Sequence, residues 1–235
     1  MQPITVLNTL GVALAAANVD TDQLIPARFM KEPRSVGYGQ FLLYDVRHDE
    51  HGTPDAEFIL HRPRAKDAEV MVSRRNFGAG SSREAAVYAL VDYGFRCVVA
   101  PSFGDIFASN AVNNGLLPAV VEEEDAERLL AGLGDAPAAI YVDLEKQVIR
   151  VAEVEVSFAI NPVWRTKLLN GWDDIDMTRQ HADTITEFAA HYAAQFPGRW
   201  RSHQRAPLSV KGSGSDAIPR VNFHKNSTHA YSRRL

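Results

Sequence analysis

The residues best suited to chemistry stand together in Asn-Phe-Gly-Ala-Gly-Ser-Ser-Arg-Glu, residues 76–84. The two glycines allow the backbone to turn sharply and to approach another group closely. Ser81 and Glu84 have the spacing of a capping box, which predicts a helix with Ser81 as its N-cap. The free amides and the positive dipole of such a helix start, with Arg83 beside them, favour an anion such as a carboxylate.

A purely structural interpretation competes with this one, in which Ser81 and Glu84 cap a helix and Arg83 is solvated. The loop lacks the Gly-Lys-Ser/Thr ending of a phosphate loop and the third glycine of a dinucleotide-binding loop. No histidine lies within two helical turns of Ser81, so a serine paired with a neighbouring base is not indicated. The pattern alone leaves both the anion site and the simple cap open.

Two further polar segments carry candidate site residues. Residues 18–22 hold Asp20 and Asp22, which either bond the backbone amides of a local turn or present a carboxylate at the end of a strand. Residues 32–39 contain one proline and two glycines, which predicts a loop. Loops of this kind often line binding sites, and this one carries Arg34.

Residues 47–54 contain two histidines and two acidic residues, a composition that raises the question of a metal site. The segment is hydrophilic throughout, whereas metal sites need converging ligands with supporting partners. We therefore expect a solvated loop here and no metal site in the chain.

The remaining pattern predicts the elements that position these segments. Apolar runs predict strands at residues 4–7, 12–17, 70–72, 97–100, 116–121, 140–142, 148–151 and 154–158. Helices are expected at residues 24–31, from Ser81, from an N-cap at Ser102 to a C-cap at Gly115, and at residues 122–133, 162–169 and 184–196. Strands alternating with helices, with strand-rich flanks, indicate an α/β domain with a partly parallel sheet.

The composition is that of a globular protein: 235 residues, of which 46% are hydrophobic and 23% charged. The single cysteine, Cys97, excludes an internal disulfide and lies in an apolar run, so we expect a buried structural thiol. No basic residue precedes Arg28, and no apolar run approaches the length of a membrane span. These features predict a soluble, cytoplasmic protein.

The charge of the chain is uneven. Residues 199–235 carry 8 basic and 1 acidic side chains, whereas the whole chain has a net charge of −4. The segment also contains Lys-Gly-Ser-Gly-Ser-Asp, a linker-like composition with little to bury. We expect a first domain at residues 1–198 followed by a basic, disordered tail, for which nucleic-acid binding is a disfavoured alternative.

Six segments, taken in order, resemble the small subunits of 3-isopropylmalate dehydratase, which match the swivelling domain of aconitase. They are residues 18–26, 76–84, 92–95, 100–107, 114–118 and 169–175. The resemblance covers about residues 1–195. It implies an aconitase-like swivelling β/β/α domain with a partly parallel central sheet.

The resemblance also implies an activity. The family members are parts of a heteromeric hydro-lyase that isomerises 2-isopropylmalate to 3-isopropylmalate in leucine biosynthesis, by dehydration and rehydration. A separate large subunit would hold a [4Fe-4S] cluster that acts as Lewis acid on this small hydroxy-dicarboxylic acid. A chain with one cysteine cannot hold such a cluster, so no cofactor is expected in this chain.

The family's functional residues transfer to individual positions of this sequence. Ser81 matches the serine base that removes the proton next to a carboxylate, and Arg83 and Asp22 match residues of the same catalytic site. The expected substrate-binding residues are Ser82, Gly80 and Arg34. The resemblance places substrate selection in the loop at residues 32–39.

Two positions depart from the family pattern: Ala79, where small subunits often have cysteine, and Ala85, where they often have histidine. These departures leave open a related hydro-lyase acting on a dimethylmalate, citraconate or homoaconitate type of acid. A non-catalytic binding subunit is a third hypothesis. The presence of both Ser81 and Arg83 argues against it.

Overall fold

The computed structural model describes residues 1–80 and 83–197. The predicted cap Ser81, its neighbour Ser82 and the basic segment from residue 198 lie outside the described residues. The described chain forms one compact unit over Met1–Ile185, and a second unit begins at Thr186, within the last helix.

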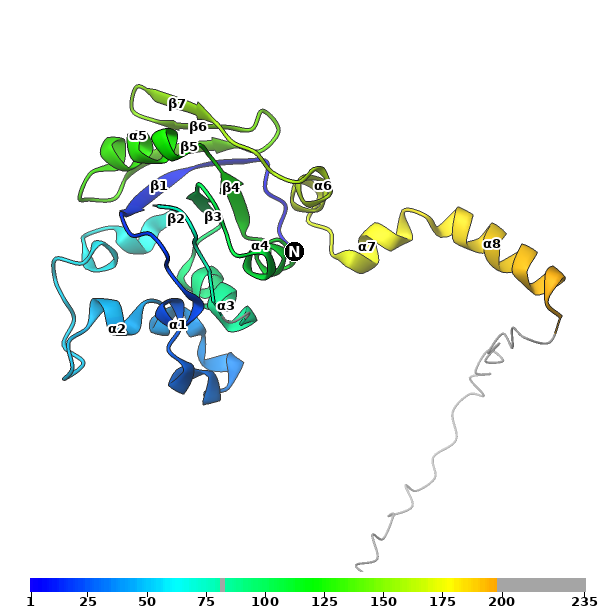
Figure 1. The fold of residues 1–235 in the computed structure, drawn as a ribbon, viewed down its shortest axis with the longest axis horizontal. Helices are drawn as coiled ribbons and strands as arrows, with labels where there is room; N and C mark the ends of the chain where they lie inside the picture. The colour runs from blue at the N-terminus through cyan, green and yellow to red at the C-terminus, as the bar shows by residue number, and fades with distance from the viewer. Residues whose placement is uncertain (81–82, 198–235) are drawn as a thin grey trace, which may run out of the picture. The chain divides into compact units, whose positions relative to one another are not determined.

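A seven-stranded mixed sheet, in the order β4-β3-β2-β1-β5-β6-β7, is the centre of the first unit (Figure 1). Its strands are β1 Val6–Leu14, β2 Ala68–Ser73, β3 Cys97–Ala100, β4 Leu117–Val120, β5 Ala138–Asp143, β6 Val148–Val151 and β7 Val154–Ser157. Strands β1 to β4 pair in parallel, whereas β5, β6 and β7 join in antiparallel pairs. The expected partly parallel sheet is therefore confirmed.

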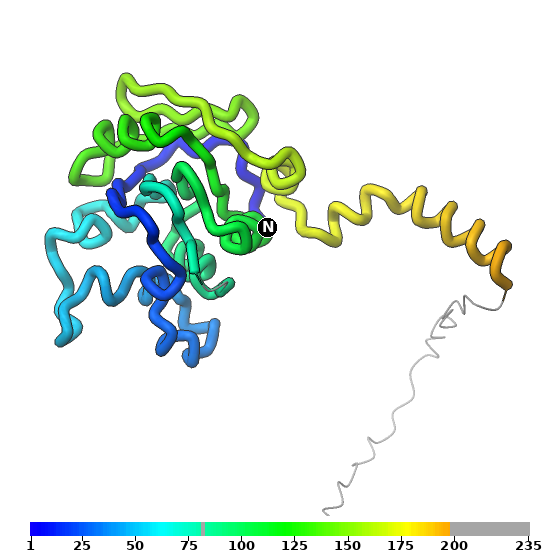
Figure 2. Tube along the Cα trace, viewed as in Figure 1, coloured from blue at the N-terminus to red at the C-terminus, as the bar shows by residue number. Residues whose placement is uncertain are grey.

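Helices connect the parallel strands and extend the chain beyond them. They are α1 Thr21–Leu24, α2 Tyr44–Arg47, α3 Glu84–Tyr93, α4 Asp105–Asn113, α5 Glu123–Leu133, α6 Pro162–Asn170, α7 Asp174–Arg179 and α8 Ala182–Gln195. Five 3-10 turns, Ala27–Lys31, Arg34–Val36, Tyr38–Phe41, Ile59–His61 and Ala65–Asp67, lie between β1 and β2. Figure 2 shows this long connection as the blue to cyan part of the trace. None of the described helices is both long and apolar enough to span a bilayer.

Both faces of the sheet are buried. Side chains alternate along each strand, so neighbouring residues pack into different apolar clusters. In β2, Met71 packs into one apolar cluster with α1, α3 and α4, whereas Val70 and Val72 pack into another with α5 and the antiparallel strands. Cys97 of β3 belongs to the second cluster, and its complete burial raises the pKa of the thiol. The expected structural cysteine is confirmed.

The predicted strands at residues 4–7 and 12–17 were wrong as two elements. The structure has the single strand β1, which pairs with β2 on one side and β5 on the other. The pairing with β2 shifts register between Leu10 and Gly11. This irregularity, next to a glycine, interrupts the sequence pattern without ending the strand.

Three predicted helix starts were also wrong. Helix α3 begins at Glu84 with Arg83, not Ser81, as its N-cap residue, and α4 begins after Gly104 rather than Ser102. The segment 24–31 divides into α1 and a 3-10 turn that starts after Pro26, because proline cannot donate the amide hydrogen bond that a continuous helix needs.

Candidate functional site

The candidate site lies at the carboxyl ends of the parallel strands. The connection after β1 carries residues 18–20 and leads into α1 with Asp22, the loop after β2 carries residues 76–80 and Arg83, and the loop after β3 carries residues 101–104. Parallel strands end at the same edge of a sheet, and open α/β sheets bind ligands beyond that edge. The topology therefore gathers segments that are far apart in the sequence.

Backbone hydrogen bonds join the first two loops directly. The Gly78 amide donates to the Val19 carbonyl at 2.7 Å, and the Thr21 amide donates to the Ala79 carbonyl at 3.0 Å. The Asn76 side chain donates to Asn18 Oδ1 at 2.8 Å. Ala79 makes its bond through the backbone, so its departure from cysteine does not remove this contact.

The third loop binds the glycine loop from the other side. The Phe77 amide donates to the Ser102 carbonyl at 3.0 Å, and the Gly104 amide donates to the Phe77 carbonyl at 2.9 Å. The Ser102 hydroxyl accepts from the Asn76 amide at 2.9 Å, which explains why this serine does not cap α4. The glycine loop is thus fixed between two neighbouring loops.

Close packing requires glycine at two positions of this arrangement. Gly78 has φ +70°, and a Cβ there would lie 2.2 Å from the Phe107 ring. A Cβ on Gly104 would lie 2.5 Å from the Gly78 carbonyl oxygen. Any side chain at these positions would push the loops apart.

The two aspartates of the first loop have different partners. The Asp20 carboxylate accepts from the Gln23 amide at 2.7 Å, and the Gln23 side chain accepts from the Asp20 amide at 3.1 Å, a capping box at the start of α1. Asp22 instead lies with Oδ1 2.6 Å from Arg83 Nη1. The local-turn interpretation therefore holds for Asp20, whereas Asp22 faces the glycine loop's arginine.

The Asp22–Arg83 ion pair brings together two of the predicted catalytic residues. The Asp22 side chain is 54% exposed and the Arg83 side chain 29% exposed. Nη1 of Arg83 is buried and makes no aligned hydrogen bond with the described residues, so the contact is one of charge rather than a directed bond.

The start of α3 faces the same loop. Its N-cap residue Arg83 provides no side-chain hydrogen bond to the first-turn amides. The Glu84 carboxylate accepts from Asn114 Nδ2 at 2.9 Å, whereas its predicted capping-box partner Ser81 lies outside the described residues. Among the described residues, the cap side chain leaves the first-turn amides and the positive dipole of this helix start available to an anion.

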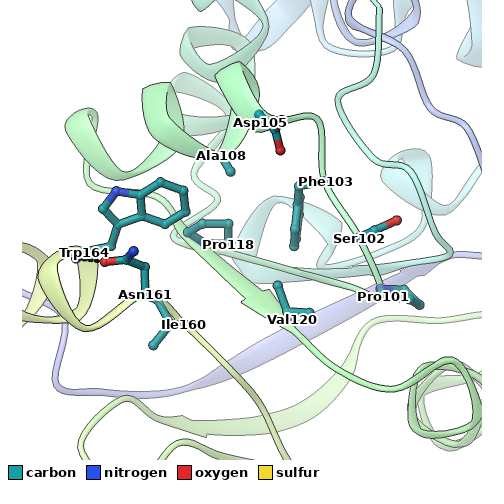
Figure 3. A pocket seen from close by; sticks show the side chains of 10 residues that line it. All are labelled: Pro101, Ser102, Phe103, Asp105, Ala108, Pro118, Val120, Ile160, Asn161 and Trp164. Atoms are coloured by element: carbon teal, nitrogen blue, oxygen red, sulfur yellow. Dashed lines mark hydrogen bonds between the residues drawn. The ribbon is translucent and has the colours of Figure 1, made fainter.

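A small hollow adjoins the glycine loop, with a volume of about 240 Å³ and a lining that includes Gly78, Gly80 and Asp105. Gly80 has φ +89°, a conformation that other residues rarely adopt. A larger pocket of about 500 Å³ lies between α4, β4 and α6, where Phe103 and Trp164 stand on opposite sides (Figure 3). The sequence pattern gave no signal for this mainly apolar pocket.

Arg34 does not join the Asp22–Arg83 pair by any contact among the described residues. Its guanidinium bonds the Asp92 carboxylate with both terminal nitrogens, and it lies over the Tyr88 ring at 4.4 Å from the centroid. Asp92 and Tyr88 belong to α3. The predicted selection loop thus lies on α3, the helix whose N-cap residue is Arg83.

The histidine-containing segment 47–54 matches the expected loop. His51 and Glu50 are strongly exposed, and His48 contacts the Tyr44 carbonyl. Within residues 1–80 and 83–197, no three histidine, cysteine or acidic side chains are grouped as metal ligands.

Comparison with known proteins identifies the family. The aconitase C-terminal domain family matches residues 1–124. The 3-isopropylmalate dehydratase small subunit of Shouchella clausii is 41% identical over 194 residues, 83% of this chain and 98% of the relative. That of Rhodopirellula baltica is 48% identical over 192 residues, 80% of this chain and 97% of the relative.

A solved structure shows the same fold. The crystal structure of 3-isopropylmalate dehydratase from Methanocaldococcus jannaschii matches with a TM-score of 0.55 at 23% identity, over 78% of this chain and 99% of that one. The expected aconitase-like β/β/α class is confirmed. The chain therefore belongs to the family of 3-isopropylmalate dehydratase small subunits, within the aconitase superfamily.

Proposed function

We propose that this chain, together with a large subunit, isomerises 2-isopropylmalate to 3-isopropylmalate by dehydration and rehydration, a step of leucine biosynthesis. The observation that carries the proposal is the Asp22–Arg83 pair at the start of α3, in a chain whose relatives bear this enzyme's name. A biosynthetic reaction on a small soluble acid also fits a cytoplasmic location.

Ser81 is the proposed base. It directly follows Gly80 of the glycine loop and stands two residues before Arg83. A serine alkoxide is costly at neutral pH, but a helix start, loop amides and a guanidinium all favour negative charge. In this role Ser81 takes the proton from the carbon next to a substrate carboxylate as the hydroxyl leaves its neighbour, and during rehydration a proton is delivered to that neighbouring carbon while water adds to the first.

Arg83, Ser82 and Gly80 are the proposed binding groups for that carboxylate. A guanidinium matches a carboxylate in geometry, and the bond between two charged groups is stronger than a neutral one. Asp22 holds Arg83 before substrate arrives. Because the Asp22 contact is not an aligned hydrogen bond, the substrate carboxylate can replace it without losing a directed bond.

The cofactor belongs to the proposed partner. Cys97 is the only cysteine and is fully buried in β3, so the thiolates of a [4Fe-4S] cluster would come from the large subunit. Such a cluster supplies a Lewis acid for the substrate hydroxyl and carboxylate. The residues of this chain supply the base and the opposite wall of the site.

Turnover of 2-isopropylmalate by the two chains mixed anaerobically tests the proposal, followed by absorbance of the unsaturated intermediate. Activity that needs both chains is the expected result. A formed complex with an intact cluster and no turnover would refute it. A panel of dimethylmalate, citraconate and homoaconitate type acids would then identify the related hydro-lyase.

A further inference from the structure

The loop that would select the substrate is fastened to α3 at one carboxylate, that of Asp92. Its oxygens accept from both terminal nitrogens of Arg34, the Nη2 bond being 2.6 Å long, and from the Tyr38 amide at 2.6 Å. The Asp92 side chain is 17% exposed. One side chain of the helix therefore holds both halves of the loop.

The loop is also closed on itself and pressed against the helix. The Tyr38 hydroxyl donates to the Glu32 carbonyl at 2.9 Å, which joins the two ends of the segment. A Cβ on Gly39 would lie 2.5 Å from the Tyr93 amide nitrogen and 2.6 Å from the Asp92 carbonyl oxygen. The backbone therefore approaches α3 at the turn that carries Asp92, as the hydrogen bonds require.

Arg34 has donors left for a ligand. A guanidinium has five N–H groups, and the contact with Asp92 uses one from each terminal nitrogen. Its side chain is 44% exposed, and the Tyr88 ring supports one face of the guanidinium. Asp92 and Tyr88 thus hold the cation in one orientation while leaving part of it open.

One face of α3 connects this contact to the proposed catalytic residues. Glu84, Tyr88 and Asp92 are spaced four residues apart, so they lie on the same side of the helix. This row of side chains begins directly after Arg83 and ends at the Arg34 contact. The position of the loop relative to the helix start is therefore set by the helix itself.

We propose that Asp92 is a positioning residue for substrate selection, which fixes Arg34 and the loop at residues 32–39 on the helix that carries the catalytic arginine. The proposal rests on the proposed function, because it assigns the loop to the same substrate. Asp92 acts through Arg34 and the Tyr38 amide, and does not itself contact substrate. Its loss would loosen substrate binding without removing the base.

Asp92→Asn in the two-chain enzyme tests this role, with Asp125→Asn as the matched control. Asp125 is a partly exposed aspartate that pairs with Arg128 on α5, across the sheet. For Asp92→Asn we expect KM for 2-isopropylmalate to rise about tenfold or more, the effect of losing a hydrogen bond between charged groups, with kcat nearly unchanged. The preference over a hydroxy acid that lacks the isopropyl group should fall in parallel. An unchanged KM and preference, or a loss confined to kcat, would overturn the proposal.

Arg34→Gln and the double variant determine whether the two residues act as a unit. Because Asp92 acts partly through Arg34 and partly through the Tyr38 amide, the effect in the double variant should exceed that of Arg34→Gln but fall short of the product of the two single effects, whereas effects that multiply fully would contradict the proposal. Hydrogen exchange of the Tyr38 amide in the assembled enzyme gives a readout that does not need turnover. Asp92→Ala, which removes the acceptor of this amide, should speed the exchange, and Asp125→Ala should not.

A failure of the proposed function is distinguishable from a failure of this inference. If the wild-type two-chain enzyme does not convert 2-isopropylmalate, the proposed function fails. Exchange of the Tyr38 amide still measures whether Asp92 holds the loop on α3. Retained protection of that amide in Asp92→Ala, which removes the acceptor, would overturn the attachment of the loop to α3 whatever the substrate.

Discussion

Asp22 and Arg83 meet at 2.6 Å although 61 positions separate them, because the loops after β1 and β2 lie side by side at one edge of the sheet. Asp22 lies in α1, and Arg83 is the N-cap residue of α3. The pair is therefore set by tertiary structure. Its two members can be changed separately without altering a common element.

Asp22→Asn should lower kcat/KM for 2-isopropylmalate by more than tenfold and leave stability nearly unchanged. A partly exposed ion pair contributes only about 0–1 kcal/mol to folding, whereas a guanidinium in the wrong orientation weakens carboxylate binding at the reacting centre. Steady-state kinetics of the two-chain enzyme and urea unfolding measure the two effects. Asp125→Asn is the control for charge loss, and equal kinetics in both variants would refute a role for Asp22.

Ser81→Ala should reduce kcat by about 10²–10⁴-fold, the usual contribution of a positioned proton-transfer group. Substrate affinity and assembly with the large subunit should be retained, because the change removes only a hydroxyl. Single-turnover kinetics measure the loss in the chemical step, and binding of the unsaturated intermediate measures the retained affinity. Near wild-type turnover would exclude Ser81 as the base.

Arg83→Lys should be nearly as harmful as loss of the charge. Lysine keeps the charge but presents a single point of contact, so it cannot match a carboxylate with two parallel hydrogen bonds. We expect KM to rise together with a fall in kcat. Unchanged substrate affinity, measured by isothermal calorimetry on the assembled enzyme, would argue against carboxylate binding by Arg83.

The sequence predicted the elements that are encoded locally. Strands β3 and β6 have the bounds expected from their apolar runs, since four consecutive apolar or alternating residues between turns specify a strand without reference to partners. The glycine loop was also located correctly, because the need for a close backbone approach is visible as Gly78. Contacts between residues that are far apart in the sequence could not be predicted in the same way.

The different uses of similar residues could not be read from the sequence. Asp20 and Asp22 are two positions apart and chemically identical, yet one caps α1 and the other meets Arg83. Ser102 resembles a helix cap, but its hydroxyl bonds the Asn76 amide of another loop. The partner of Arg34, Asp92, is 58 positions away and became evident only from the packing of the loop on α3.

Gly78→Ala should destabilise the chain by about 2–5 kcal/mol, the sum of a left-handed backbone strain and an overpacked contact. The new Cβ would lie 2.2 Å from the Phe107 ring. Gly115→Ala is the matched control, because Gly115 has φ +75° but the added Cβ would make only ordinary contacts, at 3.5 Å or more, with Met1. Urea unfolding should show a loss in unfolding free energy of only about 1–2 kcal/mol for that variant. Equal losses would show that the Phe107 contact is not tight.

Cys97 should make stability fall with rising pH in the alkaline range. Burial raises the pKa of the folded thiol above that of an unfolded cysteine, which is about 8.5. Above pH 8.5 the unfolded chain releases a proton that the folded chain retains, so the unfolded state binds fewer protons and is favoured as pH rises. The free energy of unfolding should then fall by up to about 1.4 kcal/mol per pH unit.

Urea unfolding of the wild type and Cys97→Ala between pH 7 and pH 10 isolates this effect, because other groups titrate equally in both chains. The difference in unfolding free energy should be constant up to about pH 8 and then shrink with the slope of one proton. The folded wild type should also resist a thiol reagent until urea unfolds it, since the thiolate is the reactive form. Rapid labelling of the folded chain, or parallel pH profiles of the two chains, would contradict the burial of Cys97 in β3.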